Sequence, residues 1–385
     1  MRIAIALRPD GRSRGRLIAG LAASALLAGS PARCQNPVPE PARSEDAPGA
    51  RDPSSPAALL KQKNRPGLDK DLAYAKALLD KGATEQAETA VRGIVKAHPD
   101  SAAAHFLLGY IFFGEIHQQY VAQEGRAGAG FRYNDDVGES LAKLRDAKAR
   151  ESLAEFSAGA RYATPSAFDL KIVALDYVLL KDTIAADKWL TLALKERPAD
   201  AQGWYYLGRT KYSEGRFAEA IEAFEKCLKI APRNVLAEYN VGLAYQGLGQ
   251  SEQAAQAYQN AITWQERAGE KTPEPYVALG GIYLDQHQPE RALLYLERAV
   301  LFFPQADLAR QQLAKAYSAL HRLPEAQRQL EAAVQLSPQK APLHCMLGQV
   351  YRQEQRLAEA QAEYDRCAEL QHSGSVAIAP GAKRN

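Results

Sequence analysis

Residues 201–234 read AQGWYYLGRTKYSEGRFAEAIEAFEKCLKIAPRN, and this stretch of 34 residues decides the fold. Its two halves each carry apolar residues on the 3.6-residue face that an amphipathic helix buries. A proline at the end, which has no amide proton and fixes its own φ, stops the second helix. The stretch therefore predicts a helix-turn-helix unit, marked by Trp204, Leu207, Gly208, Tyr212, Gly215, Phe217, Ala220, Phe224, Cys227 and Pro232.

The same pattern returns along most of the chain, in copies that begin at Leu68, Ala102, Ala167, Ala201, Val235, Pro273, Asp307 and Ala341. The eighth place of the first helix is always small: Ala75, Gly109, Ala174, Gly208, Gly242, Gly280, Ala314 or Gly348. Twelve places later the second helix carries Ala87, Ser152 (after an insertion), Ala186, Ala220, Ala254, Ala292, Ala326 or Ala360. Small residues at both places allow the two helices of each copy to approach closely.

These columns resemble those of the tetratricopeptide repeat family, and the resemblance extends from about residue 68 to residue 372. It implies an all-α fold: a right-handed superhelix, or α-solenoid, of about eight helix-turn-helix units over residues 67–372. Three copies depart from the pattern. The first has Asp71 and Tyr74 where an aromatic residue and a leucine are usual, and two others have Glu266 and His372 in place of the closing proline.

The second copy carries an insertion of about 31 residues at about 115–150, including a glycine-rich polar stretch, Gly125–Gly138, and then a helical run from Glu139. We interpret the insertion as a mobile loop, with a functional loop as the alternative. Its acidic residues Asp135, Asp136 and Glu139 suit a turn followed by a helix start, which we prefer to a metal site.

The first 32 residues differ from the rest and predict a cleavable signal peptide of the bacterial export type. Five arginines precede a short apolar run, Leu17–Gly29, and Ser30 and Ala32 offer the small residues that a signal peptidase recognises. An uncleaved anchor is the lesser alternative. Removal of this segment changes the formal net charge from +3 to −1, which argues against nucleic acid as a partner. The mature protein is expected in the periplasm or outside the cell, with no later membrane span.

The proline-rich residues 33–66 predict a disordered linker, and residues 373–385 predict a disordered tail. Cys34 follows the expected cleavage site, but the residues before it match a lipobox poorly, so lipid attachment is not expected. Cys227 and Cys367 occupy a column that alanine fills in other copies, so both are expected as buried fillers. Cys345 and Cys367 share one copy, yet we prefer packing to a disulfide bond, because spacing cannot establish the distance between them.

The sequence shows no constellation of catalytic residues, so we predict neither an enzyme, nor a metal site, nor a cofactor. The phosphate-loop and zinc-protease motifs are absent, and the one Gly-x-Ser-x-Gly match, Gly11–Gly15, lies in the arginine-rich start. His105 and His344 take the fourth place of their copies, where others have Trp204 or Tyr276, and are expected to replace an aromatic side chain structurally.

The family resemblance also implies a binding surface, because certain places of the first helices line the concave groove of such a superhelix. In the copies from Ala201, the lysines and asparagines with which family cochaperones hold a C-terminal carboxylate are mostly replaced, so that binding mode is not expected. Aromatic residues instead suit an extended peptide or a helix of another protein. The predicted contact residues are Tyr205, Tyr206, Arg209, Tyr212, Tyr239, Asn240, Phe106 and Tyr110.

We therefore predict a non-enzymatic scaffold that binds a protein or peptide partner in its groove. One alternative is an accessory subunit of a cell-envelope assembly or polysaccharide-export machine. A second is an enzyme with a site in the insertion. The last repeat offers a route to a homo-oligomer if its final helix is not polar enough to face solvent alone.

Overall fold

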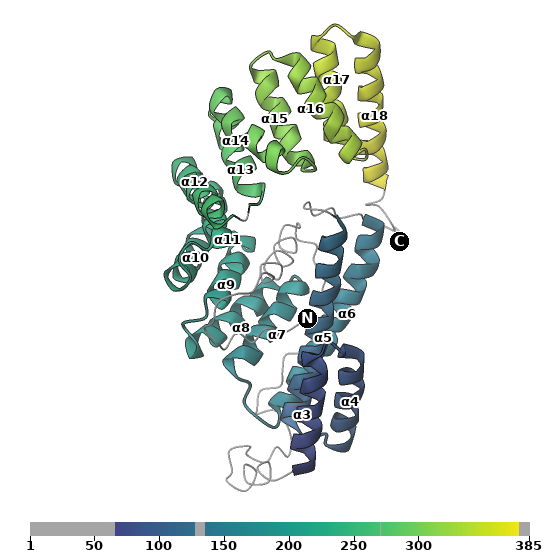
Figure 1. Ribbon diagram of the computed structural model, residues 1–385, viewed down its shortest axis with the longest axis vertical. Helices are drawn as coiled ribbons and strands as arrows, with labels where there is room; N and C mark the ends of the chain where they lie inside the picture. Colours follow the sequence, from purple (N-terminus) through teal and green to yellow (C-terminus); the bar gives the residue numbers. More distant parts are fainter. Residues whose placement is uncertain (1–65, 128–134, 270, 377–385) are drawn as a thin grey trace, which may run out of the picture. The chain divides into compact units, whose positions relative to one another are not determined.

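The computed structural model describes residues 66–127, 135–269 and 271–376, and over these ranges it contains sixteen α-helices and no strand (Figure 1). The expected signal peptide, the linker up to residue 65, Cys34 and the tail from residue 377 lie outside the described residues. The helices form eight consecutive pairs, and the all-α tetratricopeptide solenoid expected from the sequence is confirmed.

The described residues divide into two compact units after Ile230. Unit 1 contains the first four pairs and includes the inserted segment, which lengthens one of them. Its helices are α3 (Pro66–Asp80), α4 (Thr84–Ala97), α5 (Ala102–Ala127), α6 (Asp135–Ala160), α7 (Ala167–Leu179), α8 (Thr183–Glu196), α9 (Ala201–Ser213) and α10 (Phe217–Ile230).

Unit 2 contains the last four pairs. Its helices are α11 (Val235–Gly247), α12 (Ser251–Ala268), α13 (Glu274–Asp285), α14 (Pro289–Phe302), α15 (Asp307–Ala319), α16 (Leu323–Leu336), α17 (Ala341–Gln353) and α18 (Leu357–Val376). Six of the eight first helices begin at the residue where the repeat pattern begins, from Ala102 to Ala341.

Short polar side chains start several of these helices. Asp200 accepts a hydrogen bond from the backbone amide of Gly203 at 3.0 Å, and Asn234 accepts one from Ala237 at the same distance. Ser166 and Asp169 form a reciprocal capping box at the start of α7. Each contact satisfies an amide that the first turn of a helix leaves without a partner.

The turn inside seven of the pairs depends on one residue in the left-handed conformation. Glycine takes this place in three turns and a residue with a side chain takes it in four: Gly82, Gly215, Gly249, Lys181, His287, His321 and Gln355, with φ between 55° and 79°. Only glycine adopts this conformation without steric cost. The repeat therefore requires this tight turn in every copy that has it, and the four copies without glycine form it with a strained backbone.

The small residues at the eighth place let the two helices of a pair touch. A Cβ atom added to Gly208 would lie 2.6 Å from the ring of Phe224 on the second helix, and one added to Gly280 would lie 2.5 Å from Leu296. The alanine column of the second helices is fully buried in six pairs. The expected close approach of paired helices is confirmed.

The histidines at the fourth place have the structural role expected of them. Trp204 donates its indole N–H to the carbonyl of Pro198 at 2.8 Å. His105 and His344 place Nε2 at 3.0 Å from the carbonyls of Pro99 and Pro338. Since a carbonyl only accepts, Nε2 donates in both histidines.

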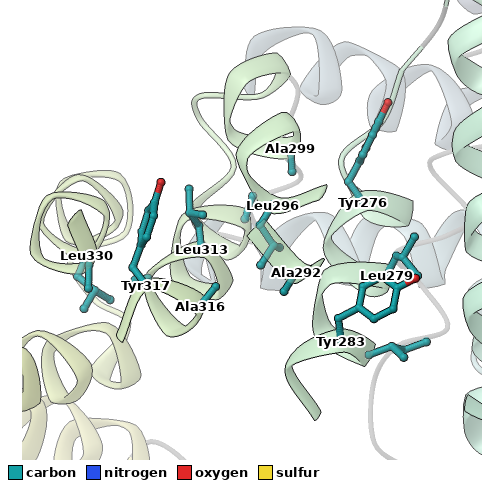
Figure 2. Packing of buried hydrophobic residues seen from close by; sticks show 14 of the residues in the cluster. Tyr276, Leu279, Tyr283, Ala292, Leu296, Ala299, Leu313, Ala316, Tyr317 and Leu330 are labelled. Atoms are coloured by element: carbon teal, nitrogen blue, oxygen red, sulfur yellow. The ribbon is translucent and has the colours of Figure 1, made fainter. Parts of the chain in front are cut away.

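Unit 2 has one continuous apolar core that runs from α12 to α18. Tyr276, Leu279 and Leu296 have no exposed surface, and Figure 2 shows buried residues that α13, α14 and α15 contribute to this core. Unit 1 has a comparable cluster in α3, α4 and α5, with Val91 and Leu108 at its centre.

The insertion is mainly helical, which corrects the expected loop. α5 continues to Ala127 and α6 begins at Asp135, four residues before the expected start at Glu139. Only residues 128–134, together with the side chains of 117–127 and 135–141, lie outside the described parts. The base of this helical hairpin is packed, because Ile116 and Ala149 cluster with Leu179 of α7. Extending a helix that has already formed needs no strong apolar period. The periodicity of the sequence therefore did not indicate that α5 and α6 continue into the insertion.

Cys345 and Cys367 form a disulfide bond between α17 and α18, which corrects the preference for packing. Their Cα atoms lie 5.4 Å apart, within the range that the bond requires. Cys367 is also buried, as expected, and Cys227 is buried with a free thiol.

The described residues include no helix both long and apolar enough to cross a membrane. Over the same residues, no three histidine, cysteine, aspartate or glutamate side chains form a group that could hold a metal ion. The side chains of Asp135, Asp136 and Glu139 lie outside this description.

Candidate protein-binding surface

Three half-buried or exposed aromatic rings gather on unit 1, where α5 faces α6 and α7. Tyr110 of α5 lies 5.4 Å from Phe168 of α7 and 5.2 Å from Phe156 of α6, measured between ring centroids. Phe106, one turn earlier on α5, stacks on Phe156 at 5.8 Å. Phe156 is buried, whereas Phe168 is 36% exposed. Phe106, Tyr110 and Phe168, with Lys171 beside them, are called the aromatic surface below.

Hydrogen bonds fix the polar edge of this surface. Lys171 donates to the carboxylate of Asp200 at 2.7 Å and to the side-chain oxygen of Gln202 at 3.2 Å, and its ammonium lies 5.4 Å from the centre of the Phe168 ring. The Tyr110 hydroxyl donates to Asp169. Burial and then the neighbouring Asp169 carboxylate raise the pKa of Tyr110 well above its usual range, so the phenol stays neutral and keeps donating.

Local sequence explains why these rings lie where they do. Gly159 of α6 has no side chain, and a Cβ there would lie 2.5 Å from the ring of Phe106. The capping box of Ser166 and Asp169 starts α7 and encloses Phe168, which lies two residues after Ser166 and directly before Asp169. The first turn of α7 therefore presents Phe168 outward while Asp169 turns toward Tyr110.

The predicted contact residues of α9 lie mostly in the interior. Tyr205, Tyr206 and Arg209 are buried, with Tyr205 packed 5.6 Å from Tyr206 and 5.9 Å from Phe224. Burial raises the pKa of Tyr206 to about 12. In this conformation these residues shape the helix packing. Their contact with a partner stays a prediction that requires the surface to open.

The remaining predicted residues divide between the two units. Tyr212 in unit 1 is half-buried against Phe217, at 5.3 Å between ring centroids. In unit 2, Tyr239 is half-buried against Tyr258 at 5.5 Å, whereas Asn240 is buried and donates its amide to the carbonyl of Leu236 at 2.7 Å. The amide of Asn240 is therefore used within its own helix. Helices α9 and α11 belong to different units, so a joint role of the two in binding stays a prediction.

The structure adds Asp169, Asp200 and Gln202 to the residues that the sequence pointed to. Their signal was present in the sequence, because Ser166 and Asp169 have capping-box spacing and Asp200 precedes a helix start. That signal predicts where helices begin. It does not predict that Asp169 accepts a hydrogen bond from Tyr110, or that Asp200 and Gln202 accept hydrogen bonds from Lys171. The aromatic surface offers ring faces, a cation and carboxylate oxygens, which can hold a polypeptide segment.

Family models described as Tetratricopeptide repeat match three parts of the chain: residues 201–234, residues 72–115 with 312–372, and residues 239–267. Each matched segment lies within the helix pairs described above.

Curated relatives share part of the chain. A cytochrome c-type biogenesis protein, CycH, from Pseudomonas aeruginosa is 30% identical over 141 residues, which cover 36% of this chain and 34% of that protein. A PEX5-related protein from Homo sapiens is 32% identical over 74 residues, which cover 19% of this chain and 12% of that protein. The chain thus spans 34% or less of the length of these relatives.

Solved structures give similar matches. YrrB, described as a tetratricopeptide protein with an unusual peptide-binding site, matches at 24% identity and a TM-score of 0.40 over 49% of this chain and 95% of that chain. The Cut9–Hcn1 complex matches at 16% identity and a TM-score of 0.47 over 74% of this chain and 56% of that chain. The eight helix pairs, their columns of small residues and the family matches identify the chain as a tetratricopeptide repeat protein.

Proposed function

We propose that this protein is a non-enzymatic scaffold that binds an extended segment of another protein on the aromatic surface of unit 1. Tetratricopeptide proteins bind protein partners, and their repeat fold typically serves interaction and not catalysis. The observation that carries the proposal is the exposed ring of Phe168 beside Tyr110 and Lys171. A ring that is partly open to solvent and held by fixed neighbours gives a partner apolar contact at little cost in conformational entropy.

The polar edge suits a polypeptide backbone. Asp169 and Asp200 each use oxygens for bonds inside the protein and retain lone pairs that accept amide protons. Lys171 is buried between Asp200 and the ring of Phe168. Its ammonium group pairs with the Asp200 carboxylate, so the two charges largely cancel. We therefore expect a neutral or weakly basic segment with an apolar side chain that packs on Phe168.

We also propose export to the periplasm or the cell exterior. The arginine-rich start followed by a short apolar run supports it, and so does the disulfide bond of Cys345 and Cys367. Structural disulfide bonds persist mainly in oxidising compartments.

A second candidate function is an accessory subunit of a cell-envelope assembly. The likeness to a cytochrome c-type biogenesis protein supports this candidate, and so does the disulfide bond, because structural disulfide bonds persist mainly in oxidising compartments.

The test is a pull-down from envelope extract with the mature chain, run beside the Phe168→Ala, Lys171→Gln variant. A partner that is retained by the wild type and lost by the variant supports the proposal. The matched control is Tyr74→Ala, Lys70→Gln on α3, which also removes an exposed ring and a nearby lysine. Equal loss in the control, or a partner unaffected by the first variant, would contradict binding at the aromatic surface.

A further inference from the structure

Helix α14 in unit 2 is apolar on two opposite faces. Its inner face, Ala292, Leu296 and Ala299, is fully buried against α13 and α15, as Figure 2 shows. Each residue turns a helix by about 100°, so Leu294 and Leu301 share one face that points nearly opposite to Leu296. Leu294 is 63% exposed and Leu301 is 73% exposed.

The other second helices show that this outer face is unusual. The two places that hold Leu294 and Leu301 are the 22nd and 29th of the repeat, and they face solvent in the other copies. Leucine occurs there in α14 alone among the described helices. The other copies have Thr89 and Lys96 (α4), Ala154 and Arg161 (α6 and the residue after it), Lys188 and Lys195 (α8), Glu222 and Lys229 (α10), Gln256 and Thr263 (α12), Arg328 and Gln335 (α16), and Ala362 and Glu369 (α18). A surface stripe with two large apolar side chains in one helix, where the comparable helices carry polar residues or a single alanine, indicates an interaction face.

Opposite charges border the two leucines. By the same helical rotation, Glu290 and Glu297 lie along one edge of the stripe, and Arg291 and Arg298 lie along the other. These four side chains give the stripe an acidic edge and a basic edge of equal formal charge.

Bonds inside unit 2 hold both edges in place. Arg291 donates to the Tyr283 hydroxyl at 2.8 Å and stacks on that ring, Arg298 pairs with Glu266, and Glu297 accepts from the Tyr317 hydroxyl at 2.8 Å. The charged borders are therefore preorganised, which lowers the entropy lost on association.

We propose that this face pairs with the same face of a second copy of the chain, with the two α14 helices parallel. When a two-fold axis runs along two parallel helices, the acidic edge of each meets the basic edge of the other. In an antiparallel pair, acidic edges meet each other and basic edges meet each other, which is repulsive. The parallel pair also places Leu294 and Leu301 against their own counterparts, so the face is complementary to itself.

This self-association is expected to be weak and reversible. A helix of 14 residues is about 21 Å long, and a contact of that length stays below the roughly 1,000 Å² of buried surface that stable interfaces exceed. It uses a different unit from the aromatic surface, so it neither requires nor excludes the function proposed above.

The test is sedimentation velocity of the full-length chain from low to high micromolar concentration. The Leu294→Lys, Leu301→Lys variant places at both positions the residue that α8 carries there, so folding should be preserved. The matched control is Ile184→Lys, Leu357→Lys, which removes two apolar side chains that are 80% and 69% exposed on other helices. We expect wild type and control to dimerise, and the α14 variant to dimerise at least about tenfold more weakly.

A charge exchange tests the parallel arrangement. In the parallel pair, Glu290→Lys places a lysine beside Arg291 of the second copy, and Arg291→Glu places a glutamate beside its Glu290, so each variant alone should dimerise less than wild type, whereas their mixture restores opposite charges and should form heterodimers. A wild-type chain that stays monomeric throughout overturns the proposal and leaves the face for a different protein. An α14 variant that dimerises as tightly as wild type overturns it as well, because the dimer then uses another surface.

Discussion

Unit 1 and unit 2 are built from the same repeat, but they bury different side chains. Among the described residues, every buried lysine, arginine and aspartate belongs to unit 1: Arg145, Asp169, Lys171, Asp176, Arg209 and Lys211. Unit 2 buries one carboxylate residue, Glu238, beside its continuous apolar core, and its other buried polar residues are Asn240, Gln265, Ser337 and His344.

The difference shows what the repeat frame permits. The small columns and the left-handed turn fix how two helices meet, and they leave the remaining interior places free to be apolar or charged. Buried ion pairs such as Lys211 with Asp187 at 2.6 Å add little net stability, because removing both charges from water costs about as much as their attraction returns. They do fix side-chain positions. Unit 2 is therefore expected to be held by packing, and unit 1 by packing together with positioned polar bonds.

The largest effect is expected from a cavity in the core of unit 2. Leu296→Ala removes a fully buried side chain that packs against Gly280, and should lower the free energy of unfolding by about 2–5 kcal/mol. Urea denaturation gives the size of the loss, and hydrogen exchange shows where protection falls. Leu190→Ala, at the same place of α8, is the matched variant in unit 1. If the two variants lower the hydrogen-exchange protection of the same amides, the two units do not unfold separately and the comparison fails.

Removal of the disulfide bond should have the next largest effect, again in unit 2. Cys345→Ala with Cys367→Ala frees a segment whose ends are 22 residues apart, and should cost about 2–4 kcal/mol. Melting curves with and without reductant measure the loss. Cys227→Ala in unit 1 is the control: its free thiol takes no part in the bond, so its melting curve should shift with reductant as the wild-type curve does, whereas the curve of the double variant should not. A wild-type curve that reductant leaves unchanged contradicts the bond.

In unit 1, Asp176 makes stability depend on pH. Burial raises the pKa of this carboxyl well above its ordinary range. Ser152 has one hydroxyl proton, yet it lies 2.6 Å from the Asp176 carboxyl and 3.1 Å from the carbonyl of Gly109. Both bonds form when a protonated Asp176 donates to Ser152 and Ser152 donates to Gly109.

The sign of the pH effect follows from that shift. In acid the carboxyl is protonated in both the folded and the unfolded chain, so it costs nothing. As the pH rises above the ordinary aspartate range, the unfolded chain releases this proton first and the folded state loses stability. Asp176→Asn keeps a donor toward Ser152 and carries no charge. It should raise the free energy of unfolding by about 1 kcal/mol at pH 8 and by little at pH 4. A difference of the same size at both pH values would refute this reason.

The repeat register was predictable from sequence because it rests on local features: small residues in all eight copies, and helix starts and closing prolines in most of them. The aromatic surface was predictable only in part. The sequence placed Phe106 and Tyr110 on one helix face, but it could not show that Phe168 stays exposed while Tyr205 and Tyr206 are covered. Exposure depends on neighbouring helices, and the disulfide bond depends on a distance of 5.4 Å that spacing does not encode.

The smallest expected effect concerns the left-handed turns, which differ between the units. Unit 1 has glycine in two of its three such turns, whereas unit 2 has glycine in one of four, and Gln355 is among the exceptions. Gln355→Gly relieves a conformation that costs a residue with a side chain about 1–2 kcal/mol, and part of that gain is offset by the larger freedom of glycine in the unfolded chain. The free energy of unfolding, measured by thermal or urea denaturation, should rise by about 0.5–1 kcal/mol.

Gln349→Gly, at an exposed place inside α17, is the control. It should lower the free energy of unfolding by a similar amount, because there the conformation is helical and only the larger freedom of glycine in the unfolded chain counts. Opposite signs for two glutamine-to-glycine changes six residues apart would assign the strain to the turn, and equal signs would remove the turn from the comparison of the two units.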